Sequence, residues 1–153
     1  DLVKSPEARM REIRGNEISM IFQEPMSSLN PVYRIGDQML EMIRTHNKQI
    51  SKKDALDQCV EMLKRVGIPS PEKRLNQYPH EFSGGMKRRV AILRAILAPT
   101  DIILMDEPFT GLDADTRQLT IDLVKELCAG KLLIIATHAE DDAELLGAKI
   151  IHL

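Results

Sequence analysis

Four consecutive apolar residues, Ile102–Met105, run directly into the acidic pair Asp106-Glu107 and then Pro108. Because this run shows no alternation of apolar and polar residues, it is typical of a strand buried on both faces in a parallel sheet. Ligands of open α/β sheets bind at the carboxyl ends of the strands, where the two carboxylates are predicted to lie. An acidic pair there suits a hard cation and an activated water, as phosphoryl transfer requires, and a solvated acidic turn is the alternative.

The composition fits one core of ordinary size without a strong overall charge. The chain has 153 residues, with 21 Lys plus Arg against 23 Asp plus Glu and a formal net charge of −2. This balance creates no field that would draw the chain to nucleic acid or an anionic membrane, so we expect no nucleic-acid partner. Cys59 and Cys128 lack metal-type spacing, and we expect them to be buried, reduced thiols.

The sequence shows no signal for membrane insertion or secretion. No apolar run approaches about 20 residues, and no signal peptide is visible. The chain begins at Asp1 instead of Met and ends on the apolar pair Ile150-Ile151. We therefore expect it to be a fragment of a larger domain.

Apolar periodicity and turn residues predict an α/β fold with an inserted all-helical part. The predicted strands are 18–22, 102–105, 132–136 and 149–153, and the predicted helices are 6–13, 35–46, 52–66, 86–97, 113–127 and 140–146, with one turn at 72–75 and a loop at 26–31. Ser5 and Ser51 are the predicted N-caps of the first and third helices, and Gly67 fits a left-handed helix stop. A mostly parallel sheet flanked by helices is therefore expected outside 34–98.

The tripeptide Ser83-Gly84-Gly85 directly precedes the predicted helix 86–97. Backbone N–H groups, a hydroxyl and the positive end of the helix dipole can bind an anion there, and two glycines let a phosphate approach closely. Three residues alone fit an ordinary capped helix start better than an anion site, so their neighbours decide. The following run, Lys87–Arg89, is expected to be a solvated helix face, and His46, His80 and His152 are expected to be solvated or structural.

Five segments, in this order along the chain, resemble the motifs of ATP-binding cassette (ABC) ATPases. They are Gln23 (the Q-loop glutamine), 82–86 (the signature motif), 102–108 (the Walker B motif), Gly111-Leu112-Asp113 (the D-loop) and Thr137-His138 (the switch histidine). The resemblance covers most of the chain and implies a partial P-loop NTPase-like fold. It divides the chain into a core part with the Q-loop (1–33), a helical subdomain ending in the signature helix (34–98) and a core part with the other motifs (99–153).

The resemblance implies a role for each matched residue. Asp106 would help hold Mg²⁺, mostly through water, and Glu107 would polarise the attacking water as general base. Gln23, as part of the nucleotide site, would touch the metal or the water and report the nucleotide state to the membrane part of the transporter. His138 would contact the γ-phosphate of ATP. The remaining implied roles are γ-phosphate binding in the opposite subunit's site by Ser83, Gly84 and Gly85, and a link between the two sites of a dimer by Asp113. Taken singly, His138 also fits a structural residue, Gln23 a loop glutamine and Asp113 a simple N-cap.

The first half carries a narrower resemblance. Residues 16–37, with 21–31 among them, and 78–86 are similar to the oligopeptide, dipeptide and nickel importer branch. Arg88, where that branch usually has Gln, and 109–115 depart from it, and this later half resembles other importer or exporter ATPases. The implied protein couples ATP hydrolysis to transport. Its implied partners are a second ABC cassette, identical or different, and transmembrane permease subunits, and its implied location is the cytoplasmic face of the plasma membrane.

The chain contains no phosphate-binding loop of the form G-x-x-x-x-G-K-[ST]. The single Gly-Lys pair, Gly130-Lys131, is followed by leucine. We therefore expect the chain alone to bind ATP poorly and to be inactive without such a loop. Two alternatives remain open, a truncated module that only offers 83–85 to a partner's ATP, and a soluble branch acting on DNA or ribosomes. The absence of sustained heptads between Gln23 and Ser83 argues against the coiled-coil members of that branch.

Overall fold

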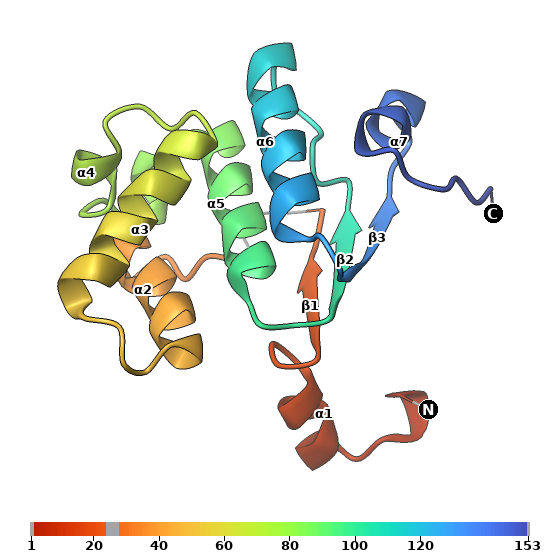
Figure 1. The fold of residues 1–153 in the computed structure, drawn as a ribbon, viewed down its shortest axis with the longest axis horizontal. Coiled ribbons are helices and arrows are strands. Elements are labelled where there is room, and N and C mark those ends of the chain that lie inside the picture. The colour runs from red at the N-terminus through yellow and green to blue at the C-terminus, as the bar shows by residue number, and fades with distance from the viewer. Residues whose placement is uncertain (1, 24–27, 153) are drawn as a thin grey trace.

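The computed structural model describes residues 2–23 and 28–152 and contains a three-stranded parallel sheet with helices beside it (Figure 1). The strands are β1 (Ile18–Ile21), β2 (Ile102–Asp106) and β3 (Leu132–Ala136), in the order β1-β2-β3. Asp106 at the end of β2 pairs with Ala136 at the end of β3. The parallel strands thus finish at one edge of the sheet, and the predicted α/β fold class is confirmed.

Helices occupy most of the remaining described chain. They are α1 (Glu7–Ile13), α2 (Ile35–His46), α3 (Lys52–Arg65), α4 (Pro71–Arg74), α5 (Gly84–Leu97), α6 (Ala114–Leu127) and α7 (Glu140–Leu146), with short 3-10 turns η1 (Leu2–Lys4) and η3 (Pro79–Glu81). These bounds agree with the predicted helices to within two residues. None of the helices in the described ranges is long and apolar enough to cross a membrane.

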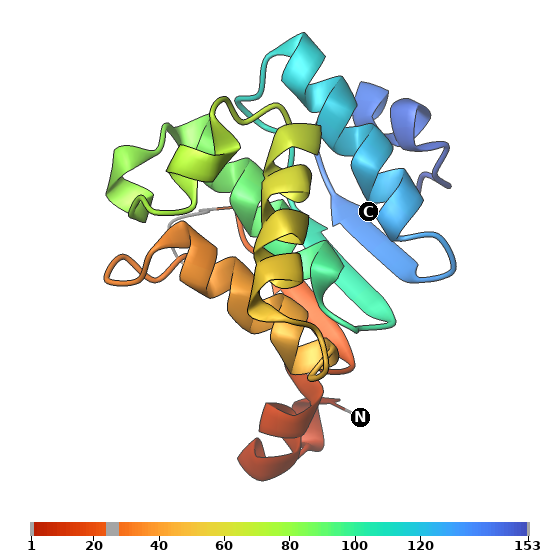
Figure 2. The ribbon, with the colours of Figure 1, turned by 60° about the vertical axis from the view of Figure 1, so that its left-hand side comes forward.

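Helix α5 lies between the sheet and the helices α2 and α3 (Figures 1 and 2). Apolar residues occur on nearly all of its sides, and Val90, Ile92 and Leu93 are completely buried. Toward the sheet, the hydroxyl of Ser19 in β1 donates to the carbonyl oxygen of Ala95 at 3.1 Å. One continuous apolar core therefore runs from α2 and α3 through α5 to β2 and α6.

Helices cover one face of the sheet in the described chain. Both crossovers, from β1 to β2 and from β2 to β3, progress in one direction, and the right-handed rule then places their helices on the same side. The burial pattern agrees with this rule, because Ile103 and Met105 are nearly inaccessible, whereas Met20, Leu132 and Ile134 are about half exposed. The prediction of strands buried on both faces is therefore correct for one face only.

Two details of the predicted secondary structure are wrong. Residues 149–152 of the predicted last strand are not in a strand, because in the described chain β3 pairs with β2 alone and they have no strand beside them. Helix α1 begins at Glu7 with Pro6 in the N-cap position, so Ser5 is not the cap. Residues 26 and 27 of the predicted loop and residue 153 of the predicted last strand lie outside the described residues.

Other predicted local signals are confirmed. The hydroxyl of Ser51 accepts the N–H of Asp54 at 3.0 Å and caps α3. At the other end of that helix, Gly67 has a φ of +68°, which is the left-handed conformation that glycine adopts without steric cost. Helix α3 is therefore delimited by its own sequence at both ends.

A substitution at Gly36 tests the close packing of α2 against the segment that follows α4. Its N–H donates to the carbonyl oxygen of Leu75 at 2.8 Å, and a Cβ placed on Gly36 would lie only 2.8 Å from that same oxygen. We expect Gly36→Ala to lower the free energy of unfolding by about 1–3 kcal/mol, because the main chain must shift. Urea denaturation of both proteins measures the difference. Gly84→Ala, whose Cβ would meet nothing within 4 Å, is the control and should unfold like the wild type.

The two cysteines provide a second test of the fold. Cys59 and Cys128 are buried free thiols, and burial raises the pKa of Cys59 to about 11. Because the thiolate is the reactive form, we expect neither residue to react with a thiol reagent in the native state at about pH 8, and both to react in denaturant. Ala129→Cys, at an exposed position beside Cys128, should react in the native state. Rapid native labelling of Cys59 would contradict the described core.

Candidate functional site

The carboxylate of Glu107, the residue after β2, collects hydrogen-bond donors at the carboxyl edge of the sheet. Its Oε1 accepts the main-chain N–H of His138 at 2.8 Å, and its Oε2 accepts the hydroxyl of Thr110 at 2.8 Å. The hydroxyl of Thr137 lies 3.5 Å from Oε2. Since the side chain is only 13% exposed, these donors replace most of the water around a free carboxylate.

The main chain at Glu107 is as constrained as the side chain. Its φ is +46°, in the left-handed region that residues other than glycine rarely adopt, and such backbone strain often occurs at functional sites. The N–H of Glu107 donates to the carbonyl oxygen of Ala136 at 2.9 Å, which extends the contact between β2 and β3 by one residue. This combination turns the carboxylate toward the loop after β3.

Hydrogen bonding also determines the protonation of Glu107. Burial by itself would raise the pKa of Glu107, but the hydrogen bonds from Thr110 and from the main chain of His138, with smaller help from the His138 ring and Thr137, hold the pKa below its ordinary value. Glu107 is therefore ionised at neutral pH. From the described residues, Oε1 accepts a single hydrogen bond, so it keeps a lone pair that can accept a further donor or a proton.

The side chain and the main chain of His138 contribute separately. The main-chain N–H holds Glu107, whereas the imidazole is fully exposed, with its Nε2 3.8 Å from Oε1 of Glu107. The ring is therefore free to meet a ligand in front of the sheet edge. These distances place Glu107 and His138, two of the predicted site residues, side by side, and their chemical roles stay predictions.

Asp106, the last residue of β2, provides a partly buried carboxylate beside Glu107. Its carboxylate forms no hydrogen bond or ion pair with any residue that the structure describes. Within 2–23 and 28–152 there is also no group of three or more His, Cys, Asp or Glu side chains that could hold a metal ion. Mg²⁺ is usually bound by one or two carboxylates together with water and phosphate oxygens, and Asp106 fits that pattern.

The amino end of α5 presents main-chain donors to solvent. Ser83 is its N-cap, and the hydroxyl of Ser83 accepts the N–H of Met86 at 3.3 Å. The N–H groups of Gly84 and Gly85 have no partner among the described residues, as is usual in the first turn of a helix. A Cβ on Gly84 would meet nothing within 4 Å, so a phosphate can approach this helix end closely.

The D-loop lies against this helix end. A Cβ placed on Gly85 would lie 3.4 Å from a methyl group of Leu112. Asp113 follows as the N-cap of α6, because its Oδ1 accepts the N–H of Thr116 at 3.0 Å. The hydrogen bonds from Thr116 hold the pKa of Asp113 below its ordinary value. The predicted N-cap is thus confirmed, and the predicted link to a second subunit stays a prediction.

Arg89 lies beneath the signature motif and is 7% exposed, so the predicted solvated face is wrong at this position. Its Nη1 donates to the carbonyl oxygens of Val66 at 2.6 Å and Gly67 at 2.9 Å, and its Nε donates to Gly85 at 3.2 Å. Burial lowers the pKa of Arg89, and the charge of Asp113 opposes that shift. The carbonyl groups at the end of α3 stabilise the buried cation and connect α3 to the signature motif.

Gln23 is exposed two residues beyond β1, and its carbonyl oxygen accepts a hydrogen bond from Arg88 of α5 at 3.2 Å. Farther along this loop, the main chain of Asn30 forms two hydrogen bonds, at 2.9 and 3.0 Å, with the buried side chain of Gln38 in α2. Arg94 of α5 lies 3.4 Å from the same amide oxygen of Gln38. The described ends of the loop after β1 are therefore fastened to α5 and α2.

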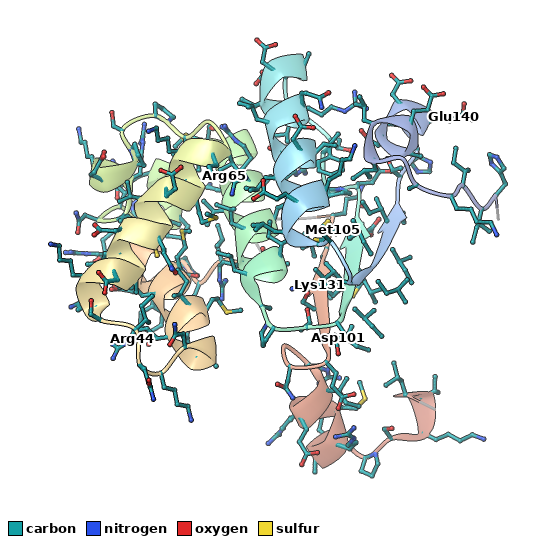
Figure 3. The ribbon with its side chains drawn as sticks, viewed as in Figure 1. Arg44, Arg65, Asp101, Met105, Lys131 and Glu140 are labelled. Atoms are coloured by element: carbon teal, nitrogen blue, oxygen red, sulfur yellow. The ribbon has the colours of Figure 1, made fainter. Side chains whose placement is uncertain are left out.

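The predicted site residues form two groups. Asp106, Glu107 and His138 meet at the carboxyl edge of the sheet, and Gln23 follows the neighbouring strand at that edge. In Figure 3 the carboxyl edge of the sheet lies on the side of Glu140, whereas Asp101 and Lys131 mark the amino ends of β2 and β3. Residues 83–85 contact the D-loop, and among the described residues no hydrogen bond or ion pair joins them to the first group.

Sequence reasoning missed part of the support around Glu107. Asp142 is 3% exposed and accepts the Nε–H of Arg117 at 2.7 Å, and Thr110 was not singled out either. A signal for Asp142 exists, because it lies three and four residues before Leu145 and Leu146 and so shares the inward face of α7. The acidic run 140–142 concealed it, since its other two members are solvated.

Comparisons with known proteins agree with this arrangement. Residues 2–110 match the family model described as ABC transporter. The chain is 50% identical over 127 residues to the oligopeptide transport ATP-binding protein OppD of Bacillus subtilis (strain 168), covering 83% of this chain and 35% of that protein. It is 45% identical over 127 residues to the dipeptide transport ATP-binding protein DppD of Lactococcus lactis subsp. cremoris (strain MG1363), covering 83% and 36%.

A solved structure is similar over nearly the whole chain. The dimeric ATP-binding cassette MJ0796, in a post-hydrolysis state bound to ADP and Pi, has a TM-score of 0.77 and 27% sequence identity, covering 93% of this chain and 61% of that chain. This chain thus spans less than two thirds of the solved cassette and about two fifths of the curated relatives. With its family model matched over 2–110 and its fold shared with this cassette, the chain belongs to the ABC transporter family of ATP-binding cassettes.

Proposed function

We propose that this chain is part of an ATP-hydrolysing subunit that drives the import of peptides through membrane permease subunits. The observation that carries the proposal is the carboxylate of Glu107, which is nearly buried, ionised, one residue after Asp106 and in contact with His138. An ionised carboxylate at the carboxyl edge of a parallel sheet is suited to polarise a water for attack on a phosphate. The complete subunit works at the cytoplasmic face of the membrane.

Each residue at the sheet edge has a separate proposed task. Asp106 and Gln23 would hold Mg²⁺, in part through water, and the ion would supply positive charge to offset that of the phosphates. Glu107 accepts a proton from the attacking water. Among the described residues, Oε1 accepts only the His138 N–H, so it keeps an acceptor site for that water while the bonds from His138 and Thr110 stay. The exposed imidazole of His138 contacts the γ-phosphate.

The signature motif is proposed to serve a second cassette. Ser83, Gly84 and Gly85 bind the γ-phosphate of the ATP that the partner subunit holds, while Asp113 borders the partner beside them. The open main-chain donors at the start of α5 and the contact between Gly85 and the D-loop support this assignment. The dimeric state of the similar cassette MJ0796 supports it as well. The helical part, 34–98, passes the motion on to the permease.

The phosphate-binding loop is proposed to come from another segment of the complete protein. The half-exposed side chains of Met20, Leu132 and Ile134 provide an apolar sheet face on which such a segment can pack. Without the loop, the backbone donors and the lysine that grip the β- and γ-phosphates are lacking. We therefore expect the 153-residue chain alone to bind ATP more weakly, and to hydrolyse it more slowly, than the complete protein that carries this loop.

Peptides are proposed as the cargo because the names of several relatives of this chain describe peptide transport. Proteins described as oligopeptide and dipeptide transport ATP-binding proteins are 45–50% identical over 127 residues. The loop sequence 21–31 and the segment 78–86 resemble the same branch. Uptake of labelled di- and oligopeptides by cells with and without the gene tests this part of the proposal directly.

Replacing Glu107 tests the catalytic assignment. Glu107→Gln keeps the oxygen that accepts the His138 N–H but removes the basic carboxylate, so in the complete protein we expect ATP turnover to fall by about 10²–10⁴-fold while ATP binding survives. Phosphate release and nucleotide binding are measured on the same preparation. Glu140→Gln is the matched control, because Glu140 is an exposed acid at the start of α7, three residues after Thr137. This variant should turn over normally. Ordinary turnover in Glu107→Gln would remove Glu107 from its role.

Two substitutions at Asp113 separate its structural and functional tasks. Asp113→Asn keeps a side-chain oxygen for the Thr116 N–H, whereas Asp113→Ala removes the cap, so only the alanine variant should lower the urea midpoint. If Asp113 also links two cassettes through its charge, Asp113→Asn should slow turnover at unchanged stability. Full turnover in Asp113→Asn would leave Asp113 as an N-cap alone.

A further inference from the structure

A buried ion pair lies behind Glu107 and has no part in the function proposed above. Asp142 of α7 is 3% exposed, and its Oδ1 accepts the Nε–H of Arg117 of α6 at 2.7 Å, with a second guanidinium nitrogen of Arg117 in contact with the same oxygen. Its other oxygen, Oδ2, lies 3.1 Å from the hydroxyl of Thr137. A carboxylate removed from water depends on such partners, because its lost hydration is otherwise uncompensated.

The hydroxyl of Thr137 lies between two carboxylates. It is 3.1 Å from Oδ2 of Asp142 and 3.5 Å from Oε2 of Glu107. A hydroxyl carries one proton, so it can donate fully to only one of the two at a time. Arg117 offsets the negative charge of Asp142 and thereby weakens that competitor for the proton. The strength of the Arg117–Asp142 contact consequently sets how firmly Thr137 holds Glu107.

Arg117 also connects this contact to the D-loop. It lies in the first turn of α6, where its N–H donates to the carbonyl oxygen of Asp113 at 2.8 Å. One hydrogen-bonded helical turn is stiff, so a displacement of Asp113 moves the guanidinium group with it. A shift of the D-loop is therefore transmitted along Asp113, Arg117, Asp142 and Thr137 to Glu107.

We propose that Arg117 and Asp142 are positioning residues that, through the hydroxyl of Thr137, adjust the placement of Glu107 to the position of the D-loop. The inference rests on the proposed function of Glu107. When a second cassette fixes Asp113, the pair fixes Glu107 of the same subunit, so that hydrolysis follows assembly. The rival explanation is that the pair only fastens α7 to α6.

A mutant cycle distinguishes these explanations in the complete protein. The variants are Asp142→Asn, Thr137→Val and the double variant. Lys125→Met is the control, because the Nζ of Lys125 donates to the carbonyl oxygen of Leu145 at 3.1 Å and so also joins α6 to α7, away from Thr137. For each protein, kcat and KM for ATP and the urea midpoint are measured. If Asp142→Asn does not fold, Arg117→Lys, which keeps the charge but loses the Nε–H, takes its place.

We expect Asp142→Asn and Thr137→Val each to lower kcat by about 10- to 100-fold at nearly unchanged KM, as for a misplaced catalytic group. In the Thr137→Val background, Asp142→Asn should lower kcat no further, while its effect on the urea midpoint persists. Lys125→Met should keep normal kcat. Independent effects on kcat in the double variant, or a similar loss of kcat in Lys125→Met, would overturn the inference.

A second measurement does not depend on turnover. The N–H of His138 donates to Glu107 at 2.8 Å, so its hydrogen exchange reports where the carboxylate lies. Because Asp142→Asn removes the charge that competes for the Thr137 proton, Thr137 should donate more fully to Glu107, so this exchange should slow in the wild-type background but not in Thr137→Val. If the wild type hydrolyses no ATP, the proposed function fails, and the exchange cycle still decides whether the pair places Glu107. Equal slowing in both backgrounds, or faster exchange in Asp142→Asn, would contradict the proposed route.

Discussion

The burial of α5 is the constraint on which the other parts of the structure depend. Its fully buried Val90, Ile92 and Leu93 require neighbours on several sides, and these are α2 and α3 on one side and the sheet on the other. The same helix begins with the open N–H groups of Gly84 and Gly85. The orientation of the signature motif is therefore determined by core packing along the whole helix and not by local turn geometry alone.

The charged residues of α5 connect it further to its neighbours through hydrogen bonds. Arg88 binds the carbonyl oxygen of Gln23, Arg89 binds the end of α3, and Arg94 lies beside the Gln38 amide that fastens the loop after β1. Each of these contacts ends on a main-chain or amide oxygen, which accepts without bringing a second charge. Three segments far apart in the sequence are thus tied to one rigid element, so a tilt of α5 would be felt by the Q-loop and the signature motif together.

The sequence predicts the elements and motifs well because their signals are local. Apolar periodicity, Ser51 as a cap and Gly67 as a stop act within a few residues, and the helix bounds follow from them. Exposure depends on what lies opposite, and this explains the errors. Leu132 and Ile134 are apolar yet half exposed, because both crossover helices lie on the other face, and Arg89 is charged yet buried, because the end of α3 supplies carbonyl groups. The partners of Glu107 were similarly hidden, since Thr110 reaches it through the turn after β2, and Thr137 and His138 reach it through the pairing of β3 with β2.

The hydrogen bond between the His138 main chain and Glu107 separates two requirements at one position. Every amino acid except proline has the N–H that holds the carboxylate, so most replacements of His138 would leave the glutamate where it is. Only the ring reaches into open solvent. Evolution can therefore exchange the chemistry of this side chain as an independent trait, with the geometry of its neighbour inherited from the polypeptide backbone.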